Sequence, residues 1–107
     1  MPISEKFENV SVTLKANVYF DGKVVSHSIF LQNGTKKTIG LVYPGTFKFN
    51  TDAGERMDII AGTCQAKIAG QAEWISYGPG SFFRVPAKSS FEMTVDQGIT
   101  EYLCSFE

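Results

Sequence analysis

The fold is decided by the stretch Gly45-Thr46-Phe47-Lys48-Phe49-Asn50-Thr51, which leads to Glu55 and then to Gly62. A second stretch follows downstream, Gly80-Ser81-Phe82-Phe83-Arg84-Val85-Pro86. The first has a glycine seven residues after its glutamate, and the second has a proline six residues after its first glycine. Short runs of aromatic and β-branched residues between glycine and proline predict strands joined by turns.

The rest of the chain repeats this pattern. Residues 10–14 alternate with a period of two, as a half-buried strand does. Asp21-Gly22 and Asn33-Gly34 are typical hairpin turns between apolar runs. We also expect a strand over 57–60 to meet a strand over 64–68 across the intervening glycine turn. No segment shows a sustained helical period, so the sequence predicts an all-β protein.

The glycine, glutamate and proline spacings are those of the two cupin motifs. The fold class is therefore predicted to be a single-domain cupin, a double-stranded β-helix or jelly-roll barrel. Metal-binding cupins carry histidines that this chain lacks, since His27 lies outside both motifs. Their positions hold, depending on spacing, Phe49 and Thr51 or Lys48 and Asn50, and in the second motif Phe91. Because a transition metal needs about three converging ligands, we predict no metal site.

Composition limits the possible functions. The chain has 107 residues, enough for one domain, and its formal net charge of −1 gives no reason to expect nucleic acid as a partner. No apolar run approaches the ~20 residues of a membrane span, and the N-terminus does not resemble a secretory signal.

Cys64 and Cys104 have no metal-binding spacing, so we expect reduced, buried thiols in a cytoplasmic protein; a disulfide between them is the alternative.

Strand parity gives Glu55 two interpretations. Phe47, Phe49 and Thr51 share one face of their strand, and the aromatic side chains favour the barrel interior for that face. Glu55 shares parity with Met57, so it can point inward, where burial would raise its pKa. Alternatively, Glu55 is a solvated residue of the preceding polar turn.

An ordered set of motifs resembles one small family of bacterial cupins. The motifs are Asn17-Val18-Tyr19-Phe20-Asp21-Gly22-Lys23-Val24-Val25-Ser26, Thr38-Ile39-Gly40-Leu41, Phe47-Lys48-Phe49-Asn50-Thr51, Glu55-Arg56-Met57-Asp58-Ile59-Ile60-Ala61-Gly62, Trp74, Gly80-Ser81-Phe82-Phe83, Val85-Pro86 and Tyr102-Leu103-Cys104. They resemble the pyrimidine/purine nucleoside phosphorylase family over residues 17–107, the expected cupin domain. Residues 1–16 are outside it and read as an N-terminal extension that adds a strand. The resemblance implies reversible phosphorolysis of purine and pyrimidine nucleosides to free base and ribose 1-phosphate, with inorganic phosphate as co-substrate and no cofactor.

The implied reaction assigns roles to candidate residues. Glu55 and Thr51 are the expected catalytic residues, Glu55 by favouring a cationic transition state at the sugar or by protonating the leaving base. Arg84 is the preferred phosphate ligand because its guanidinium binds in a bidentate way, while Arg56 has the parity to point outward. The other expected substrate-binding residues are Lys23 and Lys48 for phosphate, Asn17, Tyr19 and Asn50 for the sugar, and Tyr43, Trp74, Phe91 and Tyr102 for stacking on the base. For each of these, the alternative is a solvated charge or a core aromatic residue.

Other classes of protein fit parts of the sequence. A non-enzymatic cupin that binds a small molecule would lack the metal-binding histidines equally well. A sugar isomerase or epimerase needs an acid–base pair that is hard to build here, and a metal-dependent dioxygenase lacks its ligands. We expect nucleosides and phosphate as partners, no nucleic acid, no membrane, and a homodimer that covers edge strands and an aromatic face.

Overall fold

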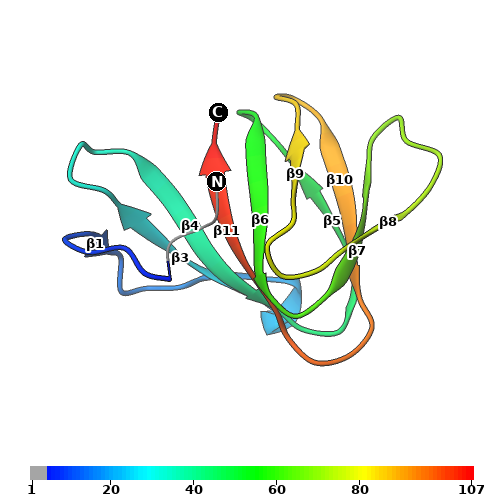
Figure 1. Ribbon diagram of the computed structural model, residues 1–107, viewed down its shortest axis with the longest axis horizontal. Helices are drawn as coiled ribbons and strands as arrows, with labels where there is room; N and C mark the ends of the chain where they lie inside the picture. The colour runs from blue at the N-terminus through cyan, green and yellow to red at the C-terminus, as the bar shows by residue number, and fades with distance from the viewer. Residues whose placement is uncertain (1–4) are drawn as a thin grey trace.

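The computed structural model describes residues 5–107; part of the expected N-terminal extension, residues 1–4, lies outside the described residues. The chain forms two antiparallel sheets (Figure 1). The first sheet has the order β1-β3-β4-β11-β6-β9, with β2 paired to β3; its strands are β1 (Ser11–Val12), β2 (Asn17–Tyr19), β3 (Val24–Phe30), β4 (Lys36–Val42), β6 (Glu55–Ala61), β9 (Phe82–Val85) and β11 (Thr100–Phe106). The second has the order β5-β10-β7-β8, with β5 (Gly45–Asn50), β7 (Cys64–Ile68), β8 (Ile75–Tyr77) and β10 (Ser90–Val95).

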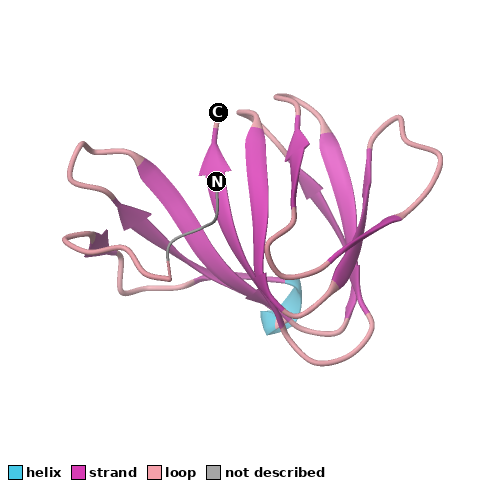
Figure 2. Ribbon diagram, viewed as in Figure 1, coloured by secondary structure: helices cyan, strands magenta, loops and turns pink. Residues whose placement is uncertain are grey.

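This arrangement is the two-sheet jelly roll of a cupin, and in the described residues its one helical element is a short 3-10 turn (Figure 2). That turn, η1 (Phe20–Gly22), joins β2 to β3 at the predicted Asp21-Gly22 hairpin. The predicted hairpin at Asn33-Gly34 joins β3 to β4. The strand expected over 10–14 is shorter, since β1 comprises two residues that pair with β3 at the edge of the sheet.

One predicted pairing is wrong. The strand over 57–60 does not pair with the strand over 64–68, because β6 belongs to the first sheet and β7 to the second. Gly62 lies in the turn that crosses between the sheets, with φ of +77°. A Cβ there would clash with the carbonyl oxygen of Ile99, so this crossing requires glycine.

The core lies between the two sheets. Met57, Ile59 and Phe83 from the first sheet pack against residues such as Phe91 and Met93 from the second, and all of these are buried. Each such side chain contributes about 1.5–3 kcal/mol by leaving water. Cys64 and Cys104 are both buried free thiols. Within residues 5–107, no helix is long and apolar enough to cross a membrane.

The two sheets do not overlap along their whole width. In Figure 1, β3 and β4 lean to the left, away from the second sheet on the right. Along each strand of the first sheet, alternate side chains point toward the second sheet and the others away from it. We call these the inner face and the outer face. Glu55 and Met57 point inward from β6, whereas Arg56 and Asp58 point outward, as their parity predicts.

Candidate functional site

The inner face of the first sheet carries three rows of residues in register across neighbouring strands. The first row, at the start of β4 and β6 and the end of β11, contains Phe30, Lys36, Phe106, Glu55 and Val85. The second contains Ser28, Thr38, Cys104, Met57 and Phe83. The third contains Asn17, Ser26, Gly40, Tyr102 and Ile59. Polar residues gather on β2, β3 and β4, and apolar residues on β6 and β9.

Burial increases from the first row to the third on β3 and β4. Phe30 and Lys36 are exposed, Ser28 and Thr38 are half-buried, and Ser26 is buried. The inner face is therefore open to solvent at the first row and closed at the third. We call the six polar residues at the border of the apolar core the inner-face cluster: Asn17, Ser26, Thr38, Glu55, Tyr102 and Cys104.

Glu55 occupies the open end of this cluster. It is half-buried, and its Oε1 lies 3.6 Å from the Sγ of Cys104, whose thiol donates a hydrogen bond to it. Burial raises the pKa of Glu55 above its ordinary value of 4.5, and the hydrogen bond from Cys104 partly offsets that rise. The inward interpretation of Glu55 therefore fits the structure, and a carboxyl held in this way keeps its proton to higher pH than an exposed glutamate.

Cys104 itself is held as a thiol. Burial, together with the nearby carboxyl group of Glu55, raises the pKa of Cys104 to about 12. A thiol with this pKa stays protonated near neutral pH and is a poor nucleophile, because nucleophilic attack needs the thiolate. What Cys104 can do here is donate a hydrogen bond to Glu55.

Tyr102 closes the deep end of the cluster. Burial raises its pKa to about 12, with hydrogen bonding from Ser26 acting in the opposite direction. The ring packs on Gly40, where a Cβ would lie 2.5 Å from the Cε2 and Cζ atoms of Tyr102. Ser26 also accepts a 3.3 Å hydrogen bond from the Nδ2 of Asn17. Tyr102 and Asn17, both predicted to bind substrate, thus lie in this cluster, with Tyr19 exposed on the neighbouring strand β2.

The positions that hold metal ligands in other cupins do not fit a metal here. Phe49 and Phe91 stack on each other with ring centroids 5.0 Å apart and an interplanar angle of 18°. Phe91 is thus a core residue rather than an exposed platform for a base. Lys48 and Asn50 point to the outer side of the second sheet. Among residues 5–107, no group of three or more His, Cys, Asp or Glu side chains is placed to hold a metal ion.

The hydroxyl group of Thr51 is hydrogen-bonded to backbone groups. Its hydroxyl donates to the carbonyl oxygen of Pro86 at 2.7 Å and accepts from the amide of Ser89 at 2.9 Å. The residue is buried. These contacts tie the end of β5 to the loop before β10, and they leave the hydroxyl little capacity to bind a substrate.

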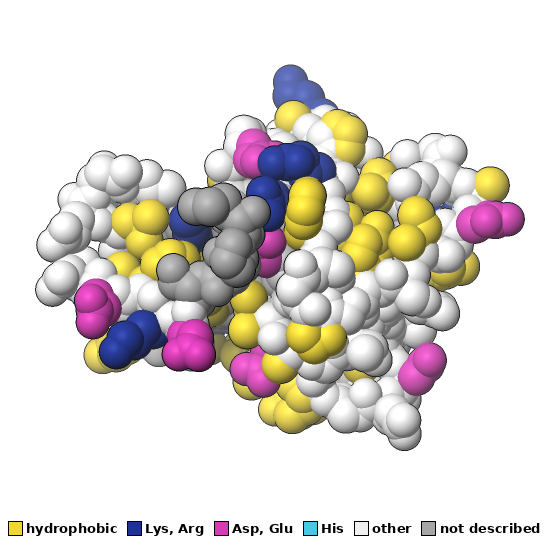
Figure 3. All heavy atoms as spheres, viewed as in Figure 1, with side chains coloured by type: hydrophobic (Ala, Val, Ile, Leu, Met, Phe, Trp, Pro, Cys, Tyr) yellow, Lys and Arg dark blue, Asp and Glu magenta, His cyan; other side chains and the backbone are white. Residues whose placement is uncertain are grey.

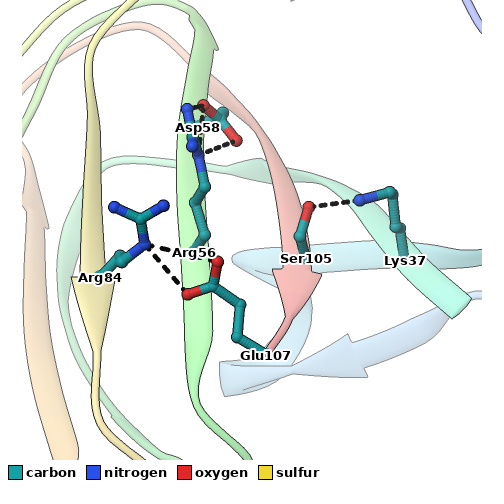
Figure 4. A network of polar contacts seen from close by, with 6 residues as sticks. All are labelled: Lys37, Arg56, Asp58, Arg84, Ser105 and Glu107. Carbon is teal, nitrogen blue, oxygen red and sulfur yellow. Dashed lines mark hydrogen bonds and ion pairs between the residues drawn. The ribbon is translucent and has the colours of Figure 1, made fainter.

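Arg84 lies on the outer face and not among the inward-facing residues near which it was expected. Figure 3 shows Lys and Arg side chains beside Asp and Glu near the middle of this face, and Figure 4 shows the contacts among them. The Nε of Arg84 donates to the Oε1 of Glu107 at 3.1 Å. On the neighbouring strand, Arg56 lies over the ring of Phe82 and forms an ion pair with the buried Asp58 at 3.2 Å. Arg56 and Arg84 are cross-strand partners, and these carboxylates offset their repulsion.

The remaining predicted substrate residues lie elsewhere. Lys23 and Tyr43 are joined by a 2.8 Å backbone hydrogen bond at the far end of β4, ~20 Å along that strand from Lys36. Trp74 is exposed in the loop before β8. The structure therefore groups Glu55, Tyr102 and Asn17, and it places Tyr19 beside Lys23 and Tyr43 toward the far end of the same sheet. Arg84, Lys48, Asn50 and Trp74 lie apart from both groups.

Sequence reasoning missed part of the cluster. Ser26, Thr38 and Cys104 belong to motifs that carried the family resemblance, but no role was assigned to them. Period-two parity offered a signal for Cys104, which is two residues from Tyr102 and must share its face. No local signal joined it to Glu55, since that contact depends on the pairing of β11 with β6.

Comparison with known proteins gives consistent results. Residues 14–106 match the family model described as pyrimidine/purine nucleoside phosphorylase. A protein of that name from Aromatoleum aromaticum is 50% identical over 106 residues, which cover 99% of each chain.

Solved structures agree on the fold. A protein of unknown function from Acinetobacter sp. ADP1 superimposes with a TM-score of 0.94 at 40% identity, over 97% of this chain and 100% of that one. Oxalate decarboxylase from Bacillus subtilis matches with a TM-score of 0.72 at 11% identity, over 99% of this chain and 31% of that one. The second likeness concerns the fold alone.

Proposed function

Because the chain belongs to the pyrimidine/purine nucleoside phosphorylase family, we propose that it is a phosphorylase of broad specificity that acts without a metal. It converts purine and pyrimidine nucleosides and inorganic phosphate to free base and ribose 1-phosphate. Its reaction takes place on the open end of the inner face, around Glu55.

The observation that carries this proposal is the position of Glu55. Its carboxyl is half-buried, has a raised pKa and lies next to the exposed ring of Phe106, its cross-strand partner. A departing nucleobase needs a proton, and a carboxylic acid with a raised pKa supplies one more readily near neutral pH. Once ionised, the same group stabilises the positive charge that develops at the sugar.

The protons balance in this scheme. The bond between the anomeric carbon and the base nitrogen breaks with its electrons passing to the base, and a phosphate oxygen forms the new bond to that carbon. Glu55 protonates the base nitrogen. Hydrogen phosphate loses its one proton on becoming the sugar ester, and that proton returns Glu55 to its starting state.

Broad specificity is supported by exposed aromatic side chains in the same row as the acid. Phe30 and Phe106 are exposed on the first row. Every nucleobase has a π face, whereas the polar edges of purines and pyrimidines differ, so aromatic contacts accept both. The deeper hydroxyl and amide groups of Ser26, Thr38 and Asn17 suit the hydroxyls of a sugar.

The absence of a metal from the proposed mechanism rests on the residues themselves. The stacked rings of Phe49 and Phe91 occupy positions that, on one of the two motif spacings, correspond to metal ligands in other cupins. Sugar chemistry that proceeds through a cationic centre needs an anion and an acid, and Glu55 supplies both in turn.

We further propose a cytoplasmic homodimer. Its support is the exposed apolar surface on and beside β2, where Val18, Tyr19 and Phe20 are 60%, 51% and 43% exposed. Exposed apolar side chains on an edge strand suit an interface with another protein. The buried free thiols Cys64 and Cys104 suit a reducing compartment. Sedimentation equilibrium at micromolar concentration tests the dimer, and a monomer mass would contradict it.

The decisive experiment is phosphate-dependent release of free base from a panel of nucleosides by chelator-treated protein, with the Glu55→Gln variant alongside. We expect both purines and pyrimidines to be cleaved, with ribose 1-phosphate as co-product and much slower turnover in the variant. No turnover with any nucleoside would contradict the proposal and favour a binding protein on the same scaffold. Activity that disappears with the chelator and returns with added metal would contradict the metal-free mechanism.

A further inference from the structure

The basic residues of the strands divide unequally between the two faces. In the part of the chain that the structure describes, the strands contain six lysine and arginine residues, and five of them point outward: Lys37, Lys48, Arg56, Lys67 and Arg84. Lys36 alone has inward parity, since it alternates with Lys37 and shares the face of Thr38 and Gly40. Among the basic residues of the described strands, Lys36 is therefore the one that shares the inner face with Glu55 and can contact a phosphate that reacts there.

The charge of Lys36 is also available to a ligand. Arg56 and Arg84 are each paired with a carboxylate, at 3.2 Å and 3.1 Å, but within residues 5–107 no carboxylate pairs with Lys36. Its Nζ lies 5.8 Å from the centroid of the Phe106 ring. This cation–π contact directs the ammonium group along the first row toward Glu55 without neutralising it.

The spacing of Lys36 and Glu55 suits the reaction. β4, β11 and β6 are consecutive in the first sheet, so two interstrand spacings separate the two residues, ~10 Å between their backbones. In a displacement at the anomeric carbon, phosphate approaches one face of the sugar and the base leaves from the other. A cation and an acid on opposite sides of Phe106 can approach a ribose that lies over this ring from its two sides.

We propose that Lys36 binds the attacking inorganic phosphate and orients it toward the sugar carbon. This inference rests on the proposed function and adds a phosphate ligand that the sequence did not indicate. An ammonium group binds phosphate as a compact charge with three donors. Phe106 keeps that charge apart from Glu55, so the carboxyl can hold its proton while the phosphate is bound.

The chain offers a matched control for the test. Lys36 and Lys37 are adjacent on one strand and point to opposite faces; the Nζ of Lys37 donates to the hydroxyl of Ser105 at 2.7 Å on the outer face. Lys36→Gln and Lys37→Gln each remove one charge. We expect Lys36→Gln to raise the KM for phosphate about tenfold or more, with little change in the KM for nucleoside. Lys37→Gln should change neither by more than about twofold, and Lys36→Arg should restore much of the phosphate affinity.

A second measurement does not depend on turnover. Titration of inorganic phosphate into each protein, followed by calorimetry and by amide chemical shifts, should show binding that Lys36→Gln weakens and Lys37→Gln does not. Equal phosphate affinity in the two variants would overturn the role of Lys36, as would wild-type protein that does not bind phosphate. If phosphate binding follows Lys36 but no nucleoside is cleaved, the proposed function fails while the phosphate site stands.

Discussion

The thiol of Cys104 donates a hydrogen bond to the carboxyl group of Glu55 across 3.6 Å, from β11 to β6. The two residues are 49 positions apart in the sequence, and one of them is a buried thiol whose pKa is about 12. The contact therefore persists near neutral pH, where it partly offsets the rise that burial causes in the pKa of Glu55, the proposed acid.

Removing the thiol should raise the pKa of Glu55 further, because the hydrogen bond from Cys104 lowers it. In Cys104→Ala we expect the carboxyl titration of Glu55, followed by ¹³C NMR, to move to higher pH, and the limb of the pH–rate profile that reports this acid to move with it. Cys104→Ser keeps a donor and should stay closer to the wild type. Identical titration of Glu55 in the Ala variant and the wild type would show that the thiol has no influence.

Glu55→Gln should reduce kcat for phosphorolysis by about 10²–10⁴-fold, the usual contribution of a positioned acid. The substitution keeps the size and polarity of the side chain but cannot transfer a proton. The measurement is kcat with a purine and a pyrimidine nucleoside at saturating phosphate. Full activity of the variant on both nucleosides would show that Glu55 does not take part in the reaction.

The same variant should change how stability depends on pH. The folded-state pKa of Glu55 is raised above the ordinary value of 4.5, so between these two values the native state binds more protons than the unfolded state. Its contribution to stability is fully present below pH 4.5 and is lost as the pH rises through the folded-state value. We expect Glu55→Gln to gain stability relative to wild type over this window, as measured by urea unfolding at several pH values. A stability difference that does not vary with pH would contradict the raised pKa.

The two outer-face arginines should differ in their effect on stability. Arg56→Ala leaves the carboxylate of Asp58, whose side chain is 6% exposed, without its partner and should cost about 1–3 kcal/mol. Arg84 and Glu107 have side chains 56% and 44% exposed, so Arg84→Ala should cost about 0–1 kcal/mol. Because Arg84 points away from Glu55, its variant should also keep the wild-type KM for phosphate. A large rise in that KM would instead support Arg84 as a ligand of the phosphate.

Gly40→Ala should disturb the deep end of the inner-face cluster. The added Cβ would meet ring atoms of Tyr102 at 2.5 Å, so the ring must shift, at a cost of about 1–3 kcal/mol. Gly78→Ala is the matched control, because a Cβ there meets nothing within 4 Å. Thermal unfolding of both variants checks the difference, and equal melting temperatures would contradict the packing of Tyr102 on Gly40.

Thr51→Val tests whether Thr51 is catalytic or structural. The valine keeps the shape but loses both hydrogen bonds to the loop before β10, which should cost about 1–3 kcal/mol in the free energy of unfolding. We expect kcat to stay near the wild-type value at a temperature where the variant is folded. A large fall in kcat without a loss of stability would support the catalytic role.

Much of this protein can be read from its sequence. Alternation along each strand is local, so parity put Glu55 on the same face as Met57 and Arg56 on the opposite face, while the burial of Glu55 stayed open. Turn residues such as Asp21-Gly22 and Asn33-Gly34 have backbone preferences that do not depend on distant contacts, and both hairpins form. The ordered motifs indicated the family because their order and spacing can be recognised in the linear sequence, without knowledge of distant contacts.

Tertiary structure decided which strands are neighbours. The turn at Gly62 resembles a hairpin turn, yet it carries the chain from the first sheet to the second, because burial of both apolar faces outweighs a local pairing. That choice brings β4, β11 and β6 side by side and so puts Lys36, Cys104 and Glu55 on one surface, while Arg84 lies on the other. The sequence determined which residues of a strand share a face, through a two-residue period. The packing of the two sheets determined which face is covered and which side chains meet.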